Sequence, residues 1–158
     1  MNRIELIDVA LLEAASRLAA ASPRLRKNYN FHASSAEPCN RLLNAIEPGS
    51  YVRPHCHAEA TKDETIVVLR GRIGVLEFDR AGQVSGSAVL EPAGRAMGIN
   101  VPHGTFHSLL ALAAGTVFFE AKAGPYTALL PSESPHWAPE EGSAQAPRYL
   151  EWMRSHFE

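Results

Sequence analysis

The chain has 158 residues with a formal net charge of −2, and 46% of its residues are hydrophobic. This length and composition suit one globular domain, exclude intrinsic disorder, and lack the basic character that nucleic acids and anionic membranes require of a partner. Because the chain has only two cysteines and no apolar run long enough to span a membrane, we expect a cytoplasmic protein.

The first predicted element is a helix near the N-terminus. Asp8 is a suitable N-cap, and Ser22-Pro23 ends the helix. Apolar residues recur on one face at helical spacing, at Leu11, Leu12, Ala15, Leu18 and Ala19. The basic residues that follow, Arg24, Arg26 and Lys27, are either solvated or bind an anion such as phosphate.

The middle of the chain predicts short strands separated by Gly- and Pro-containing turns. The expected strands are 40–47, 51–57, 64–70, 72–79, 83–90, 96–101, 106–112 and 116–122. No intervening segment is long enough for a crossover helix, so we expect antiparallel pairing in a sandwich or barrel.

The C-terminal part is rich in proline and ends in a short helix. Pro147 begins this helix, and Leu150, Met153 and Phe157 form its apolar face. We therefore expect a single all-β domain with a helix at each end. Residues 1–37 form an N-terminal helical extension packed on the barrel, 38–124 the β-barrel, and 125–158 a tail with the short helix.

Histidines and a glutamate in the predicted strands indicate a metal site. His55 and His57 alternate with other residues, so both side chains project from one face of a strand. Glu64 opens the next strand, and His107 follows the turn Pro102-His103-Gly104. Each motif alone has an ordinary structural explanation, but together they predict one divalent transition metal ion: Fe, Mn, Ni, Zn or Cu.

These segments resemble the two motifs of the cupin superfamily, a family of small antiparallel jelly-roll β-barrels. The first motif, Gly49-x5-His55-x-His57-x6-Glu64-x6-Gly71, has a gap of six residues before the glutamate, where the family has three or four. In the second, Pro102-x-Gly104-x2-His107, Ala111 replaces the usual Asn, and Ala96 stands where a Gly usually precedes the Pro. Neither departure removes a ligand of the set that the resemblance implies, namely His55, His57, Glu64 and His107.

The resemblance extends over nearly the whole chain to WbuC-type cupin metalloproteins. It is carried by segments such as Asn28-Tyr29-Asn30-Phe31-His32, Lys62-Asp63-Glu64-Thr65 and Trp137-Ala138-Pro139-Glu140. These bacterial proteins are associated with surface-polysaccharide biosynthesis. The resemblance therefore implies a small-molecule metalloenzyme acting on a sugar or nucleotide-sugar by isomerase, epimerase or lyase chemistry. The alternatives are a non-catalytic sugar- or effector-binding module and an iron-dependent dioxygenase.

Other polar residues are candidates for the mouth of the barrel. Glu120 and Lys122 share one face of a strand, and an outward orientation is the commoner case for such a charged pair. If the two side chains point inward, they become candidates for proton transfer. Tyr51 is a further candidate catalytic residue. Candidates for substrate binding are Arg41, Asn44, Arg53, Tyr126 and Arg26. We also expect a small-molecule ligand, with a carbohydrate as the candidate class, and a homodimer formed through outer sheet faces.

Overall fold

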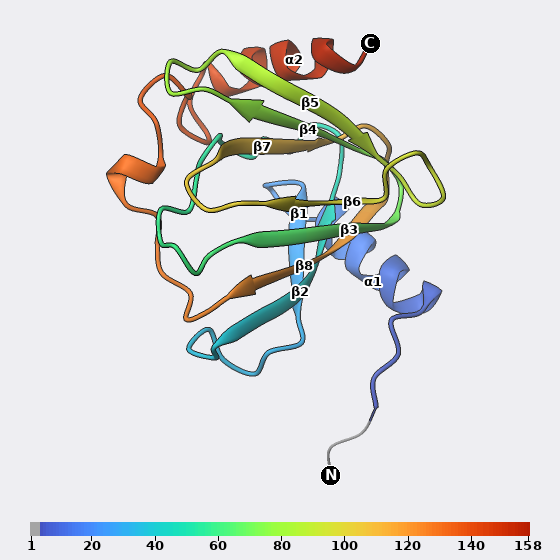
Figure 1. Cartoon of the computed structure of the whole chain (residues 1–158). Helices are drawn as coiled ribbons and strands as arrows, with labels where there is room; N and C mark the ends of the chain where they lie inside the picture. Colours follow the sequence, from blue (N-terminus) through green and yellow to red (C-terminus); the bar gives the residue numbers. More distant parts are fainter. Residues whose placement is uncertain (1–3) are drawn as a thin grey trace.

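The computed structural model describes residues 4–158, in which two antiparallel sheets carry a helix at each end of the chain (Figure 1). The helices are α1 (Val9–Ala20) and α2 (Ala146–Arg154), with 3-10 turns η1 (Pro131–Glu133) and η2 (Ser155–Phe157). The strands are β1 (Arg26–Asn30), β2 (Cys39–Ile46), β3 (Glu64–Arg70), β4 (Ile73–Phe78), β5 (Val84–Leu90), β6 (Gly98–Val101), β7 (Phe106–Ala111) and β8 (Thr116–Ala123).

The strands form a five-stranded sheet, in the order β1-β2-β8-β3-β6, and a three-stranded sheet, in the order β5-β4-β7. All pairs are antiparallel, as expected. Ile46, Ile66 and Phe118 from the larger sheet pack against Ile73 and Leu90 from the smaller one. The predicted all-β jelly roll is confirmed, with its core between two facing sheets.

Helix α1 covers the outer face of the larger sheet. Asp8 caps it as predicted, because its carboxylate accepts a hydrogen bond from Leu11 N at 2.9 Å. The helix buries Ala15 and Ala19 against Ala45 of β2 and Val117 of β8. The outer face of β2 and β8 is therefore apolar where the helix covers it. The polar side chains of Asn44 and Glu120 lie on the opposite, inner face of these strands.

Helix α2 covers the outer face of the smaller sheet. It begins at Ala146, with Pro147 in its first turn, and it buries Leu150 and Met153 against Leu76 of β4. The helix ends at Arg154, so Phe157 belongs to the following turn, where its ring packs over Gly74. A Cβ at Gly74 would lie 2.6 Å from that ring, so only glycine fits there.

Two segments differ from the sequence-based expectation. Residues 51–57 run extended but pair only through one isolated bridge, between His55 and His107. Pro54 has no N–H to donate, and Cys56 N donates instead to Glu133 O at 3.0 Å, so no ladder forms. Strand β1 was not predicted within the helical extension, because its sequence Arg-Lys-Asn-Tyr-Asn lacks apolar alternation.

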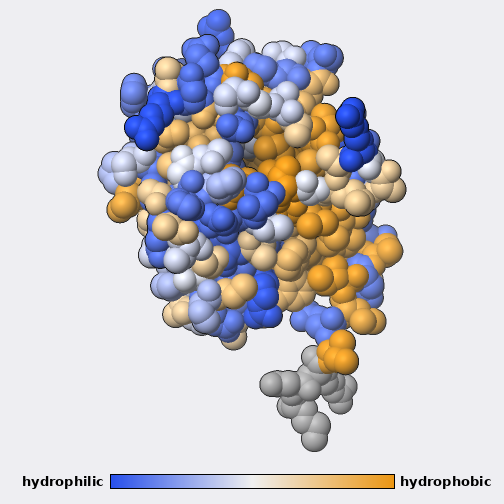
Figure 2. Space-filling view, viewed as in Figure 1, coloured by the Kyte–Doolittle hydropathy of each residue, from blue (hydrophilic) through white to orange (hydrophobic). Residues whose placement is uncertain are grey.

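Exposed hydrophobic side chains concentrate on α1 and the segment before it, as with Ile4, Leu6, Val9 and Leu18. In the space-filling view, hydrophobic residues gather on the right-hand side, and hydrophilic residues dominate the upper left (Figure 2). Neither helix within residues 4–158 combines the length and apolar character needed to cross a bilayer.

Candidate metal centre and ligand cavity

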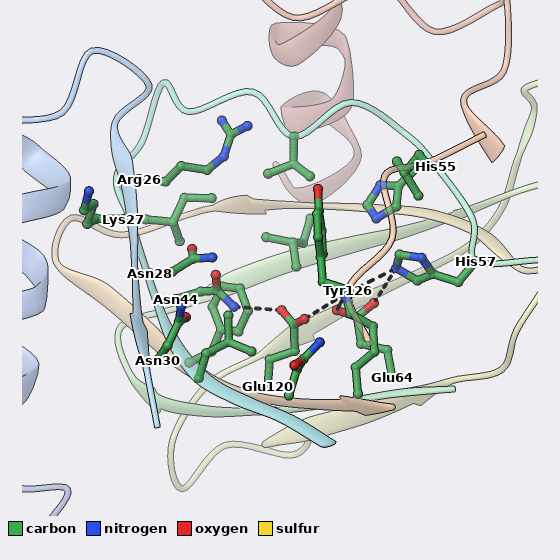
Figure 3. Close-up of a pocket in the computed structure, with 18 of the residues that line it drawn as sticks. Arg26, Lys27, Asn28, Asn30, Asn44, His55, His57, Glu64, Glu120 and Tyr126 are labelled. Carbon is green, nitrogen blue, oxygen red and sulfur yellow. Dashed lines mark hydrogen bonds and ion pairs between the residues drawn. The ribbon is translucent and has the colours of Figure 1, made fainter. Parts of the chain in front are cut away.

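The four predicted metal ligands meet between the two sheets. His55 and His57 lie on the extended segment after β2, Glu64 opens β3, and His107 lies on β7. The backbones of His55 and His107 exchange two N–H···O bonds, of 3.0 and 2.9 Å, which hold the two segments together. Figure 3 shows His57 and Glu64 facing each other, with His55 beside them. The six-residue gap before Glu64 is a loop that returns the chain to the histidines.

Glu64 is the centre of this cluster. Its Oε2 atom lies 3.3 Å from His107 Nε2 and 3.6 Å from His57 Nε2. The ring of His55 lies 4.7 Å from that of His107 and 5.2 Å from that of His57, measured between centroids. The structure thus brings together three imidazoles and one carboxylate from three separate parts of the chain.

Backbone carbonyls determine which ring nitrogen carries the proton. His55 Nδ1 lies 2.9 Å from Arg53 O, and His107 Nδ1 lies 2.9 Å from Thr105 O. A carbonyl oxygen only accepts, so each Nδ1 is the donor, and Nε2 of a neutral ring presents a lone pair. Burial and the neighbouring His107 lower the pKa of His55 to about 3, so this ring is neutral at physiological pH.

The buried carboxylate of Glu64 lacks a conventional hydrogen bond at one oxygen. Within residues 4–158, Glu64 Oε2 has no hydrogen-bond partner, and the residue is 5% exposed. Burial acts to raise its pKa, but His107, His57 and the charge of Lys122 hold that pKa well below its usual value. Glu64 Oε2 lies 3.3 Å from His107 Nε2, and if His107 carries its only proton on Nδ1, two acceptors lie face to face. A cation between them would remove this conflict.

The residue types of this cluster are those that bind divalent transition metals, but their arrangement here is not that of a metal site. No group of three or more His, Cys, Asp or Glu residues within 4–158 is arranged so that it could hold a metal ion. Imidazole nitrogens and one carboxylate are nevertheless ligands that Fe, Mn, Ni, Zn and Cu accept. The carbonyl bonds to the Nδ1 atoms are also the outer contacts that orient histidine ligands.

The expected outward orientation of Glu120 and Lys122 is wrong, because both side chains point inward. Glu120 is 8% exposed, and its Oε1 lies 3.0 Å from Lys122 Nζ. Lys122 Nζ also lies 3.7 Å from Glu64 Oε1 and 3.5 Å from His57 Nε2. The pair points inward because α1 covers the opposite face of β8, where Val117 is buried.

These two charges have opposite protonation behaviour. Burial and the charge of Glu64 raise the pKa of Glu120 to about 7. Burial acts to lower the pKa of Lys122, but the charges of Glu120 and Glu64 outweigh it and raise that pKa. Asn44 Nδ2 donates to Glu120 Oε2 at 2.7 Å and orients the carboxyl group. Glu120 can therefore exchange a proton near neutral pH, while Lys122 stays charged.

A cavity of about 750 Å³ opens from the histidine cluster toward β1 and β2 (Figure 3). Among the predicted substrate-binding residues, Arg26, Asn44 and Tyr126 line it. Three asparagines that the sequence analysis did not single out as binding residues line it too: Asn28, Asn30 and Asn40. The alternation Asn28-Tyr29-Asn30 places two amides on one face of a strand. This pattern indicates a polar face only once the segment is known to be a strand, and β1 was not predicted.

Three predicted site residues lie outside the lining of this cavity. The hydroxyl of Tyr51 donates to Pro139 O at 2.9 Å in the core beneath α2, and burial raises its pKa, so it is a packing residue. Arg53 donates to Ala138 O and Pro135 O, which fixes the C-terminal segment. Arg41 is exposed and pairs with Glu37 at 3.4 Å.

The arrangement of the two sheets is that of a cupin-type jelly roll. Residues 7–90 match the family described as a domain of unknown function, DUF6016, and because this match covers more than half of the chain, the protein belongs to that family. None of the curated proteins is similar enough to this chain to count as a relative.

Solved structures with this architecture come from several bacteria. TT1209 from Thermus thermophilus is 21% identical with a TM-score of 0.53, covering 76% of this chain and 97% of that one. SPY1581 from Streptococcus pyogenes, a protein of unknown function, is 11% identical with a TM-score of 0.53, covering 80% and 93%. KdgF from Halomonas sp. is 18% identical with a TM-score of 0.52, covering 67% and 84%. At these identities the likeness shows the fold alone.

Proposed function

We propose that this protein is a WbuC-type cupin metalloenzyme that acts on a sugar or nucleotide-sugar in bacterial surface-polysaccharide biosynthesis. His55, His57, Glu64 and His107 would hold one divalent transition metal at the base of the cavity. The expected chemistry is an isomerase-, epimerase- or lyase-like reaction of a small molecule in the cytoplasm. Two observations support the proposal: the cluster of four donor residues, and the neighbouring Glu120, which can exchange a proton near neutral pH.

The observation that carries the metal is the contact between Glu64 and His107. Glu64 Oε2 lies 3.3 Å from His107 Nε2 and has no hydrogen-bond partner among residues 4–158. In a protein interior such a contact is costly unless a proton or a metal lies between the atoms. The bond from His107 Nδ1 to Thr105 O orients the ring, so Nε2 is the nitrogen that would coordinate a metal.

The residues beside the cluster supply acid–base chemistry. A bound divalent metal would supply Lewis acidity toward a carbonyl or hydroxyl oxygen of the substrate. Glu120, with a pKa raised to about 7, can accept or donate a proton at its carboxyl oxygens. Lys122 holds Oε1 of this carboxyl group and Asn44 holds Oε2, so the proton exchanges at a defined position.

The remaining wall of the cavity limits water around these groups. Between the histidines and β1, the cavity is lined by apolar side chains from both sheets and from the segment after β2: Leu42, Ile46, Val52, Leu109 and Phe118. A less polar environment strengthens the electrostatic interactions of Glu120 and Lys122 with a bound molecule. An enzyme benefits from this arrangement more than a binding module does, because it places a group that exchanges protons next to the proposed metal.

Metal analysis followed by activity screening tests the proposal. Protein isolated from its native producer is expected to contain about one transition metal per chain, measured by mass spectrometry, since four ligands form one site. The metal-loaded protein is then incubated with a panel of sugar nucleotides, with and without O₂, and the products are followed by NMR. Turnover without O₂ that depends on the metal and is lost in Glu120→Gln supports the proposal. Stoichiometric metal with conversion only in the presence of O₂ would favour an oxygenase instead. A protein that binds no metal from any of the five candidates would overturn it.

A further inference from the structure

The wall of the cavity formed by β1 and β2 is unusually rich in carboxamides. The chain has six asparagines, and four of the five within residues 4–158 line this one cavity. Asn28 and Asn30 alternate on the inner face of β1, and Asn40 and Asn44 lie on the inner face of β2. Asn28 and Asn44 are direct cross-strand partners, so their side chains are neighbours.

One of these amides is buried with an unused acceptor. Asn40 is 4% exposed, and its Oδ1 atom has no hydrogen-bond partner within residues 4–158. Buried carbonyl oxygens are normally satisfied, so this unused acceptor sets Asn40 apart from amides that serve only the fold. Asn44, by contrast, already donates to Glu120, which connects the amide wall to the proton-exchanging end of the cavity.

The arginines that line the cavity already donate to groups of the protein, which argues against a phosphate at this wall. Arg26 donates to Ser50 Oγ, Tyr51 O and Glu141 Oε2. Arg24 makes two further bonds to the same Glu141, each 2.8 Å long. At the other end, Lys122 is paired with Glu120 and Glu64.

The two remaining lysines that line the cavity are not poised to bind an anion there either. Lys62 Nζ donates to Pro125 O and to Thr127 Oγ1, each at 2.8 Å. Lys27 lies on the far side of β1 from Asn28, as strand alternation requires (Figure 3).

We infer that the inner faces of β1 and β2 form a subsite for an uncharged, polyhydroxylated ring, with Asn28, Asn30 and Asn40 as the residues that recognise its hydroxyls. A carboxamide both donates and accepts, as a hydroxyl does, and it carries no charge. Tyr126 lines the same cavity with 65% of its surface exposed, and its ring offers an apolar surface for the carbon face of a sugar. The inference rests on the proposed function only in taking this cavity as the substrate site; it places the sugar ring, and not a phosphate, against β1 and β2.

Binding measurements on the metal-loaded protein test the subsite. The probes are D-glucose, D-galactose, D-mannose and N-acetyl-D-glucosamine, each compared with its 1-phosphate and with inorganic phosphate alone, by ligand-observed NMR titration. At least one neutral sugar is expected to bind, with its 1-phosphate no more than about threefold tighter, since the arginines and Lys62 already donate within the protein and Lys27 lies on the other face of β1. Asn28→Ala and Asn30→Ala are each expected to weaken binding about fivefold, and the double variant about 25-fold, as for one and two lost hydrogen bonds.

Matched variants separate recognition from stability. Asn100→Ala is the control, because Asn100 lies outside the cavity and bonds to Thr65 at 2.8 Å; it should leave affinity unchanged. Asn40→Leu preserves volume and removes the buried acceptor, and the exposed Asn28 and Asn30 variants provide the test even if Asn40→Leu does not fold. The subsite is overturned if no neutral sugar binds, if the 1-phosphates bind more than about tenfold tighter, or if the double variant binds like the wild type.

Metal content measured in the same samples distinguishes the two proposals. Full metal content without sugar binding overturns the subsite alone. If the wild-type protein takes up no metal but binds a sugar, and the double variant loses that binding, the metalloenzyme is overturned and the subsite is supported.

Discussion

Replacing Glu64 by Gln should destabilise the metal-free protein and abolish its response to metal. His107, His57 and the charge of Lys122 hold the pKa of Glu64 well below its usual value, so the folded protein favours the charged carboxylate over a neutral side chain. Lys122 keeps a partner in the variant, because Glu120 remains 3.0 Å away. The substitution therefore removes one favoured negative charge without leaving Lys122 unpaired.

The magnitude follows from the loss of the contacts that favour this one buried charge. Hydrogen bonds to a charged group predict that the free energy of unfolding of the metal-free protein falls by about 1–3 kcal/mol. For a chain of this size the melting temperature should then fall by about 3–10 °C. Wild-type protein should gain about 2.7 kcal/mol from metal at a hundred times its dissociation constant, whereas Glu64→Gln should gain far less.

Urea unfolding followed by tryptophan fluorescence, with chelator and with saturating metal, measures both effects. Glu13→Gln on the exposed face of α1 is the matched control and should change neither value by more than about 0.5 kcal/mol. If the metal-free Glu64→Gln protein is instead more stable than the wild type by about 1 kcal/mol or more, the metal-free fold does not favour a charged Glu64. That result would refute the lowered pKa of Glu64.

Three further predictions concern the site and its supports. The double variant His55→Ala/His57→Ala should lose its metal, measured by mass spectrometry, while its circular dichroism stays that of a folded jelly roll; retained stoichiometric metal would count against the site. Glu120 has a pKa raised from 4.5 to about 7, so its contribution to stability is complete below pH 4.5 and is lost as the pH rises to about 7. The stability of wild type relative to Glu120→Gln should therefore fall across this window in urea titrations, and a constant difference would contradict the raised pKa. Gly71 and Gly104 both have positive φ, so alanine is strained at either position. Gly71→Ala should lower the free energy of unfolding by more than about 3 kcal/mol, because the added Cβ would lie 2.3 Å from a side chain of β8. Gly104→Ala should cost only about 1 kcal/mol, because no atom lies within 4 Å of a Cβ at Gly104. Equal melting temperatures for these two glycine variants would contradict the packing argument.

The elements that the sequence predicts well carry their signal locally. Helix α1 has its cap at Asp8 and an apolar stripe, and seven of the eight expected strands coincide with β2 to β8 to within two residues at each end. The His-x-His segment is visible because alternation on an extended chain places both rings on one side. The spacing of motif residues therefore predicted which four side chains meet, although they come from distant segments.

Strand β1 and the direction of Glu120 and Lys122 were decided by tertiary structure. Strand β1 is polar because its inner face lines a cavity, and no periodicity within Arg26–Asn30 records that fact. The face of β8 that carries Glu120 turns inward because α1 covers the other face, and strand periodicity cannot specify which face a helix will cover.

The pattern of residues in this chain predicted the class of fold and its helix at each end, because these depend on alternation, capping or spacing within a few residues, while the resemblance to the two cupin motifs supplied the candidate metal ligands. Only the packed structure decided that Tyr51 belongs to the core and that Arg26 is held by Glu141. It also gathered four asparagines into one cavity wall. These properties depend on what lies across a cavity or under a helix, and contacts between residues far apart in the chain arise only when the sheets pack.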